Sequence, residues 1–133
     1  MNESFHDNPP LMLERVQAGF PSPAEQYVES SLDLNQYLVH NPAATFFVRA
    51  SGDSMQNAGI RSGDLLVVDR SVQPKDGSVV IAAVDGEFTV KYYSCKNGKI
   101  CLLPGNDSYP PIELHDGMEL QIFGVVTAIV HKC

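Results

Sequence analysis

The sequence has few basic side chains and no long apolar run. Nine Lys and Arg residues stand against sixteen Asp and Glu residues, which gives a net charge of −7. Binding to nucleic acid through phosphate contacts needs a basic face, so this balance argues against broad electrostatic binding to DNA or RNA. The longest apolar runs, 65–68 and 79–84, are far shorter than the roughly 18 residues that indicate a membrane span. We therefore expect a protein without a membrane anchor.

Cysteine is also scarce, with residues at positions 95, 101 and 133. An odd count without a close pairing pattern argues against a secreted disulfide framework and fits a reducing compartment. The first ten residues contain neither the basic nor the apolar region of a signal peptide, so we expect a cytoplasmic protein. No Cys-x-x-Cys pair exists, the four histidines are scattered, and no phosphate-binding glycine loop occurs. We therefore expect neither a metal site nor a cofactor.

Proline divides the chain into an arm and a domain. Asn8-Pro9-Pro10 and Pro21-Ser22-Pro23 bracket a segment in which proline favours extended backbone. Residues 11–20 between them are apolar enough to dock on a surface but too few to form a domain. The sequence therefore predicts an exposed N-terminal arm over residues 1–24 and one folded domain over residues 25–133. A chain of this length can bury roughly two-thirds of the surface that it exposes when unfolded.

The pattern of the domain is mainly β. Residues 30–39 predict one short amphipathic helix, with Ser30, Ser31 or Asp33 as its N-cap. Asp85-Gly86 is a strong signal for a two-residue hairpin. We expect a twisted, partly closed antiparallel β fold. β-branched and apolar segments between Gly, Pro, Asn and Asp clusters predict the strands, at 45–50, 64–69, 78–84, 87–93, 100–103, 112–114 and 120–131.

A turn after the first of these strands presents a serine. The strand-forming run Thr45-Phe46-Phe47-Val48 leads into Ser51-Gly52-Asp53-Ser54, where glycine permits a turn and Ser and Asp favour caps. The pattern predicts the Ser54 hydroxyl on a bend whose outward backbone amides suit a developing oxyanion. Ser-Gly-Asp-Ser is also ordinary loop chemistry, so the turn has catalytic meaning only if a base reaches the serine.

Lys91 is the candidate base. It follows the Asp85-Gly86 hairpin on a predicted strand with aromatic and β-branched neighbours. A free lysine titrates near ~10.4, so it acts as a base only where desolvation lowers its pKa. The residues alone leave a solvated strand lysine as the alternative. A Ser-His-Asp triad is the less favoured alternative, because no Gly-x-Ser-x-Gly elbow is present.

Three motifs in the same order resemble the LexA/UmuD family of self-cleaving, S24-type serine–lysine peptidases. They are Ala50-Ser51-Gly52-Asp53-Ser54-Met55, Gly63-Asp64-Leu65-Leu66-Val67-Val68-Asp69 and Val84-Asp85-Gly86-Glu87-Phe88-Thr89-Val90-Lys91. The resemblance covers about residues 17–130, and segments 17–24 and 33–36 fit the UmuD branch. It implies a serine endopeptidase with Ser54 as nucleophile, Lys91 as general base, the backbone amides of Asp53 and Ser54 as oxyanion donors, and Ala18–Gly19 as the scissile bond.

The resemblance also implies a role in SOS mutagenesis. A RecA filament on single-stranded DNA would trigger self-cleavage, and the shortened homodimer would serve as an accessory subunit of a UmuC-like, error-prone Y-family translesion polymerase. Eighteen residues precede the bond, so we expect no DNA-reading half and no sequence-specific DNA binding. One alternative is a non-cleaving binding module that acts on the polymerase as the intact chain. A signal-peptidase-like role would need a membrane anchor. The sequence leaves open whether an arm is cut by its own subunit or by its neighbour.

Overall fold

The computed structural model describes residues 8–12, 28–115 and 117–133. The chain divides into two compact units, residues 1–38 and residues 39–133. The predicted boundary between arm and domain, at residues 24 and 25, lies outside the described ranges and stays a prediction. The same holds for the predicted scissile bond between Ala18 and Gly19.

The first unit contains a short antiparallel pair of strands and one short helix. Strand β1 (Pro10–Met12) pairs with β2 (Val28–Ser31), and helix α2 (Leu34–Leu38) follows. Asp33 caps the helix, because its Oδ1 accepts a hydrogen bond from the Gln36 amide at 3.3 Å. The prediction that the helix begins at residue 30 is wrong, since residues 30 and 31 pair with β1.

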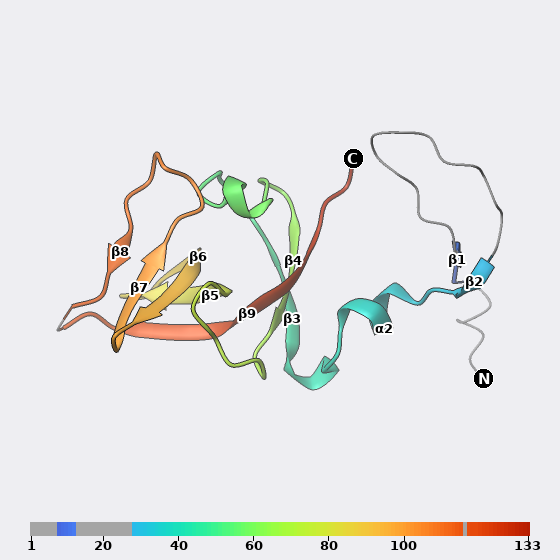
Figure 1. The fold of residues 1–133 in the computed structure, drawn as a ribbon, viewed down its shortest axis with the longest axis horizontal. Helices are drawn as coiled ribbons and strands as arrows, with labels where there is room; N and C mark the ends of the chain where they lie inside the picture. The colour runs from blue at the N-terminus through green and yellow to red at the C-terminus, as the bar shows by residue number, and fades with distance from the viewer. Residues whose placement is uncertain (1–7, 13–27, 116) are drawn as a thin grey trace. The chain divides into compact units, whose positions relative to one another are not determined.

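The second unit is built on an antiparallel sheet of seven strands, in the order β3-β4-β9-β5-β6-β7-β8 (Figure 1). The predicted mainly β, antiparallel fold is confirmed. The last strand in the chain, β9, lies between β4 and β5 and pairs with both. Two 3-10 turns, η1 (Pro42–Ala44) and η2 (Gln56–Ala58), flank β3. The strands are β3 (Thr45–Arg49), β4 (Leu65–Asp69), β5 (Val79–Val84), β6 (Glu87–Lys96), β7 (Lys99–Leu103), β8 (Ile112–Glu113) and β9 (Leu120–Val130).

A two-residue turn joins β5 to β6 and fixes the register of the lysine strand. Asp85 and Gly86 both have positive φ, at 48° and 83°, as a type I′ turn requires. The predicted hairpin is therefore confirmed. Its register places Lys91 opposite Val80, a residue with no exposed surface. Lys91 is thus held on a regular strand beside the core.

The core lies on both faces of β5, which explains the continuous apolar run at 79–84. Successive side chains of a strand point to opposite faces. Ile81 packs into one buried cluster, whereas Val80 and Ala82 pack into another. The first cluster also includes Met55, which is 3% exposed. Burying a side chain of this size contributes roughly 1.5–3 kcal/mol, so the residue after Ser54 is anchored in the core.

Candidate active site

The serine turn begins where β3 ends. Ala50 is buried, its amide donates to the Asp64 carbonyl at 2.8 Å, and its carbonyl accepts from the Gly63 amide at 2.8 Å. Gly52 has a φ of 84°, a conformation that glycine adopts without steric cost. Residues 51–53 are exposed, and the chain returns to the core at Met55. Ser54 is therefore a half-buried residue between two anchored ends of the turn.

Ser54 and Lys91 lie together although 37 positions separate them. Lys91 Nζ is 3.1 Å from Ser54 Oγ, within hydrogen-bond distance, and it donates a second hydrogen bond to the Val90 carbonyl at 3.1 Å. The Lys91 side chain is 9% exposed. The structure thus brings together the two residues that the sequence singled out as nucleophile and base.

The environment of Lys91 favours its neutral amine. Burial lowers the pKa of the ammonium group below its usual value, because desolvation penalises the charged form. Within the described residues, no carboxylate forms an ion pair with Lys91 to offset that penalty. A neutral amine has a lone pair, which accepts a proton from the hydroxyl that it contacts. The pair can therefore perform base-assisted nucleophilic chemistry.

The backbone amides of Asp53 and Ser54 are available at the turn. Neither amide donates a hydrogen bond to any residue in the described part of the chain. Unpaired N–H groups beside a nucleophile are the donors that an oxyanion site needs. The two amides that the sequence analysis named are therefore free to serve.

A second loop, after β7, holds the serine turn through hydrogen bonds. The Gly105 amide donates to the Ser54 carbonyl at 2.7 Å. Asn106 Nδ2 donates to the Asp53 carbonyl at 3.0 Å, and the Tyr109 hydroxyl donates to Asp53 Oδ1 at 2.6 Å. We call residues 104–109 the clamp loop. The turn residues at 104–107 predict a loop but do not indicate these contacts.

Gly105 brings the clamp loop into direct contact with the serine turn. A Cβ atom at this position would lie 3.1 Å from Met55 Cα and 3.3 Å from the ring of Tyr92. Only glycine allows this approach without a shift of the backbone beside Ser54. Its carbonyl also accepts from the Asn57 amide at 2.7 Å. In the sequence, this glycine among the turn residues at 104–107 predicts a turn, but it does not predict that the turn contacts the serine turn.

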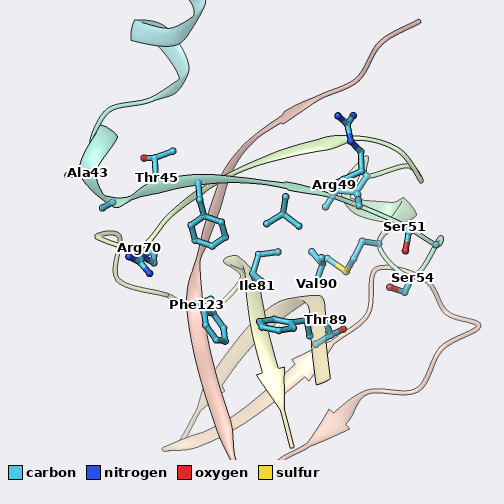
Figure 2. A pocket seen from close by; sticks show the side chains of 18 residues that line it. Ala43, Thr45, Arg49, Ser51, Ser54, Arg70, Ile81, Thr89, Val90 and Phe123 are labelled. Carbon is cyan, nitrogen blue, oxygen red and sulfur yellow. The ribbon is translucent and has the colours of Figure 1, made fainter. Parts of the chain in front are cut away.

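A mostly apolar groove of about 710 Å³ opens beside Ser54 (Figure 2). Ser51 and Ser54 lie at one end of it, and Ala43 and Arg70 lie at the other. The groove follows β3, which forms one edge of the sheet. An edge strand beside an apolar groove suits an extended peptide segment. The apolar lining includes Phe46, Val48, Ile81, Phe88, Val90 and Phe123.

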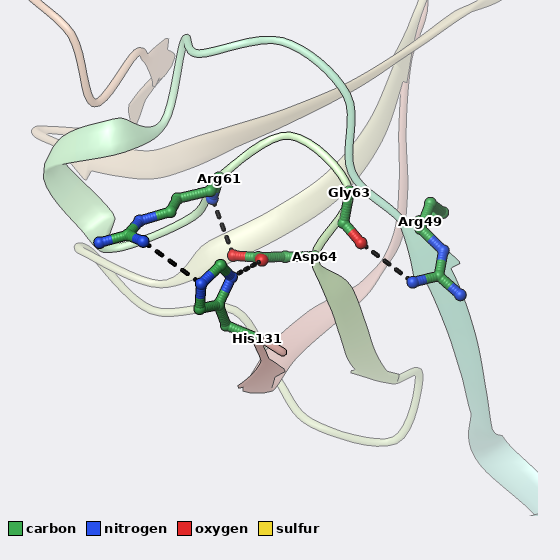
Figure 3. A network of polar contacts seen from close by, with 5 residues as sticks. All are labelled: Arg49, Arg61, Gly63, Asp64 and His131. Atoms are coloured by element: carbon green, nitrogen blue, oxygen red, sulfur yellow. Dashed lines mark hydrogen bonds and ion pairs between the residues drawn. The ribbon is translucent and has the colours of Figure 1, made fainter. Parts of the chain in front are cut away.

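A buried carboxylate ties the C-terminal end of the chain to the base of the serine turn (Figure 3). Asp64 is 2% exposed, its Oδ2 accepts from the Arg61 amide at 2.8 Å, and its Oδ1 is 2.6 Å from His131 Nδ1. The Arg61 guanidinium, which can only donate, is 3.2 Å from His131 Nε2. With the Arg61 donor facing Nε2, the hydrogen bond to Asp64 is donated by His131 Nδ1. These bonds, led by the one from the Arg61 amide, lower the pKa of Asp64.

Two further features bear on function. In the described ranges, no three His, Cys, Asp or Glu side chains gather closely enough to hold a metal ion. No helix within those ranges has the length and apolar content that crossing a membrane requires.

Comparison with known families assigns the chain to one of them. The sequence profile of the Peptidase S24-like family matches residues 10–127, most of the chain. The chain belongs to this family, and the resemblance noted from its motifs is confirmed.

Similar proteins cover nearly the whole chain. The chain is 55% identical to Protein SamA of Salmonella typhimurium strain LT2, over 98% of the chain and 90% of that protein. It is 52% identical to Protein ImpA of Escherichia coli, over 92% of the chain and 83% of that protein. It is also 38% identical to the LexA repressor of Shewanella baltica strain OS155, over 91% of the chain but 59% of the repressor.

Proposed function

We propose that the chain is a serine endopeptidase that cuts its own Ala18–Gly19 bond with a Ser54–Lys91 dyad. The observation that carries this proposal is the 3.1 Å contact between the Ser54 hydroxyl and a buried lysine amine. Membership of the Peptidase S24-like family supports it. The lowering of the Lys91 pKa by burial supports the role of general base.

The proposed reaction uses the groups that the serine turn brings together. Neutral Lys91 takes the hydroxyl proton as Ser54 Oγ attacks the Ala18 carbonyl carbon. The amides of Asp53 and Ser54 donate to the oxyanion of the tetrahedral intermediate. The C–N bond then breaks, and the Lys91 ammonium gives its proton to the departing Gly19 amine. Water, deprotonated by Lys91, hydrolyses the acyl ester and restores the serine.

The second contact of the lysine helps to aim it. Because one amine hydrogen is bound to the Val90 carbonyl, rotation of the neutral Lys91 amine is restricted. Its lone pair can then face Ser54 at little entropic cost. The substrate bond suits the same site, since Ala18 and Gly19 are small residues in an arm rich in apolar side chains. An extended arm of this composition matches the apolar groove beside Ser54.

The biological role that we propose is that of a UmuD-like protein of SOS mutagenesis. A RecA filament on single-stranded DNA triggers cleavage in the cytoplasm. The truncated homodimer then acts as an accessory subunit of a UmuC-like Y-family polymerase. Identity of 52–55% to Protein SamA and Protein ImpA over most of their lengths supports this assignment within the family.

The test is the mass of the products. The purified chain is incubated with RecA, single-stranded DNA and a nucleoside triphosphate, and separately at alkaline pH without RecA. We expect a fragment that begins at Gly19, formed faster at alkaline pH because Lys91 loses its proton. Chains with Ser54→Ala or Lys91→Ala should stay intact.

The outcomes separate the alternatives. If no fragment begins at Gly19 under either condition, the peptidase assignment fails, and the intact chain becomes the candidate for the polymerase-binding form. Mixing the Ser54→Ala chain with the parent chain tests whether cleavage occurs between subunits. Comparing how the intact and truncated chains bind the polymerase then tests the accessory role.

A further inference from the structure

We propose that Asn106 is a positioning residue for self-cleavage, because it fixes the peptide between Asp53 and Ser54 so that the Ser54 amide faces the oxyanion. This inference rests on the proposed function. It adds a residue that lies outside the serine and lysine motifs, on the clamp loop.

The Asn106 side chain is buried and fully bonded. It is 7% exposed, its Nδ2 donates to the Asp53 carbonyl at 3.0 Å, and its Oδ1 accepts from the Ser108 amide at 3.0 Å. The Ser108 amide can only donate, so the side-chain oxygen of Asn106 must face it. The nitrogen is then left to face Asp53. The clamp loop therefore sets the direction of this donor.

A held carbonyl also aims the amide of the same peptide. The Asp53 carbonyl and the Ser54 N–H belong to one peptide, which is trans, because the described residues contain no cis peptide bond. The two groups of a trans peptide point in opposite directions. Ser54 lines the groove, whereas Asn106 does not. Drawing the carbonyl toward Asn106 thus turns the Ser54 N–H away from the clamp loop and toward the groove side of the turn.

The bond from Asn106 differs from the other bond to the same carbonyl. The Asp53 carbonyl also accepts from the Gln56 amide at 3.2 Å. That bond closes the turn on itself and moves with it, so it does not orient the turn in the molecule. Asn106 and Gly105 instead connect two successive peptides, through the Asp53 and Ser54 carbonyls, to the clamp loop. Donors that are fixed before reaction stabilise an oxyanion without reorganisation.

The decisive variant is Asn106→Asp, measured by the rate of self-cleavage against pH up to its plateau. The carboxylate keeps an oxygen for the Ser108 amide but replaces the donor to Asp53 with an acceptor that repels the carbonyl. We expect a plateau rate about 10- to 100-fold below that of the parent, somewhat less than the loss of a whole oxyanion donor. The added charge should also raise the pKa of Lys91. On the plateau Lys91 is neutral in both chains, so this change in pKa does not affect the comparison of plateau rates.

Asn41→Asp is the matched control. It makes the same chemical change at an exposed asparagine whose side chain makes no cap hydrogen bond. Its plateau rate should equal that of the parent. Asn106→Ala is the second variant, and thermal unfolding checks that it is folded. The orientation of the amide is followed separately by NMR, through the ¹H–¹⁵N resonance of residue 54 in chains that carry Ser54→Ala and therefore do not cleave. This resonance should move in the Asn106 variants and not in the Asn41 variant.

Each result decides a separate question. Plateau rates of the Asn106 variants within twofold of the parent overturn the positioning role. If Asn106→Asp does not fold, the plateau rate and the residue 54 amide resonance of Asn106→Ala test the positioning role. An amide resonance that does not move in Asn106→Ala overturns the proposal. A parent chain that never yields a fragment beginning at Gly19 overturns the proposed function instead, and the resonance alone then tests whether Asn106 orients the amide.

Discussion

Two buried ionisable residues contact the serine turn or its base, Lys91 through Ser54 and Asp64 through Ala50, and their pKa values are lowered for opposite reasons. Lys91 is buried and has no ion pair within the described residues, so desolvation favours its neutral form. Asp64 accepts hydrogen bonds from the Arg61 amide and from His131, so bonding favours its charged form. Both pKa values are lowered, so the cause of the shift distinguishes the two residues. Desolvation of Lys91 favours a neutral amine that can act as a base, whereas hydrogen bonding favours the charged carboxylate of Asp64 in a structural role.

The two shifts act on stability in different ranges of pH. In both cases the folded chain binds fewer protons than the unfolded chain, so the free energy of unfolding rises with pH inside each range. The bonds of Asp64 contribute stability above its usual pKa of 3.8, and this contribution is lost as pH falls through the folded value. The cost of burying charged Lys91 is fully present below its folded pKa and is relieved as pH rises from that value toward its usual pKa of 10.5.

The largest effect is expected for Lys91→Met. Self-cleavage should slow by about 10²- to 10⁴-fold, because a general base is lost. The free energy of unfolding at pH 7 should not fall, because no buried ammonium remains to be desolvated. Urea unfolding at pH 7 and pH 10, with the fragment masses, checks both points. A variant that is less stable than the parent at pH 7 would contradict the assigned cause of the pKa shift.

A smaller effect is expected from two glycine variants that crowd different places. A Cβ at Gly105 meets the Met55 backbone at 3.1 Å, and one at Gly124 meets Val68 Cγ1 at 2.6 Å. Each change to alanine should cost about 1–3 kcal/mol of stability, the range for overpacking. Only Gly105→Ala should also slow plateau cleavage, by about tenfold, because it displaces the turn itself. Cleavage rates of both variants are measured at one temperature, below the unfolding temperature of each. Equal slowing of cleavage in Gly105→Ala and Gly124→Ala would contradict the idea that the clamp loop positions the serine turn.

The smallest effect on cleavage is expected for Asp64→Asn, which should mainly change the free energy of unfolding. The variant should be less stable than the parent at pH 7, because the bond from His131 loses its charged acceptor. The difference should shrink as pH falls below 3.8, where the carboxylate of the parent also gains a proton. Thermal unfolding at a series of acidic pH values measures this convergence. Parallel curves for the two chains would mean that the Asp64 charge does not stabilise the fold.

Local sequence patterns predict the strands, whereas contacts between residues far apart in the chain cannot be predicted from such patterns. Asp85-Gly86 predicts its hairpin because the turn geometry depends on those two residues alone. The start of α2 was misplaced because pairing of residues 30 and 31 with β1 overrides their capping tendency. Ser54 and Lys91 were singled out separately, but their contact depends on the order of strands in the sheet. The role of Asn106 is not predictable from its turn residues, because a turn pattern does not identify the loop that the turn contacts.

The central place of β9 has a consequence for the timing of synthesis. The serine follows β3 and the lysine lies on β6, and their halves of the sheet, β3-β4 and β5-β6, are hydrogen-bonded to each other only through β9 among the described strands. A growing chain contains both residues well before it contains residues 120–130. We expect the serine–amine contact to form only once this last strand has been made. Under the proposed function, a nascent chain would therefore not cut its own arm before β9 has been synthesised.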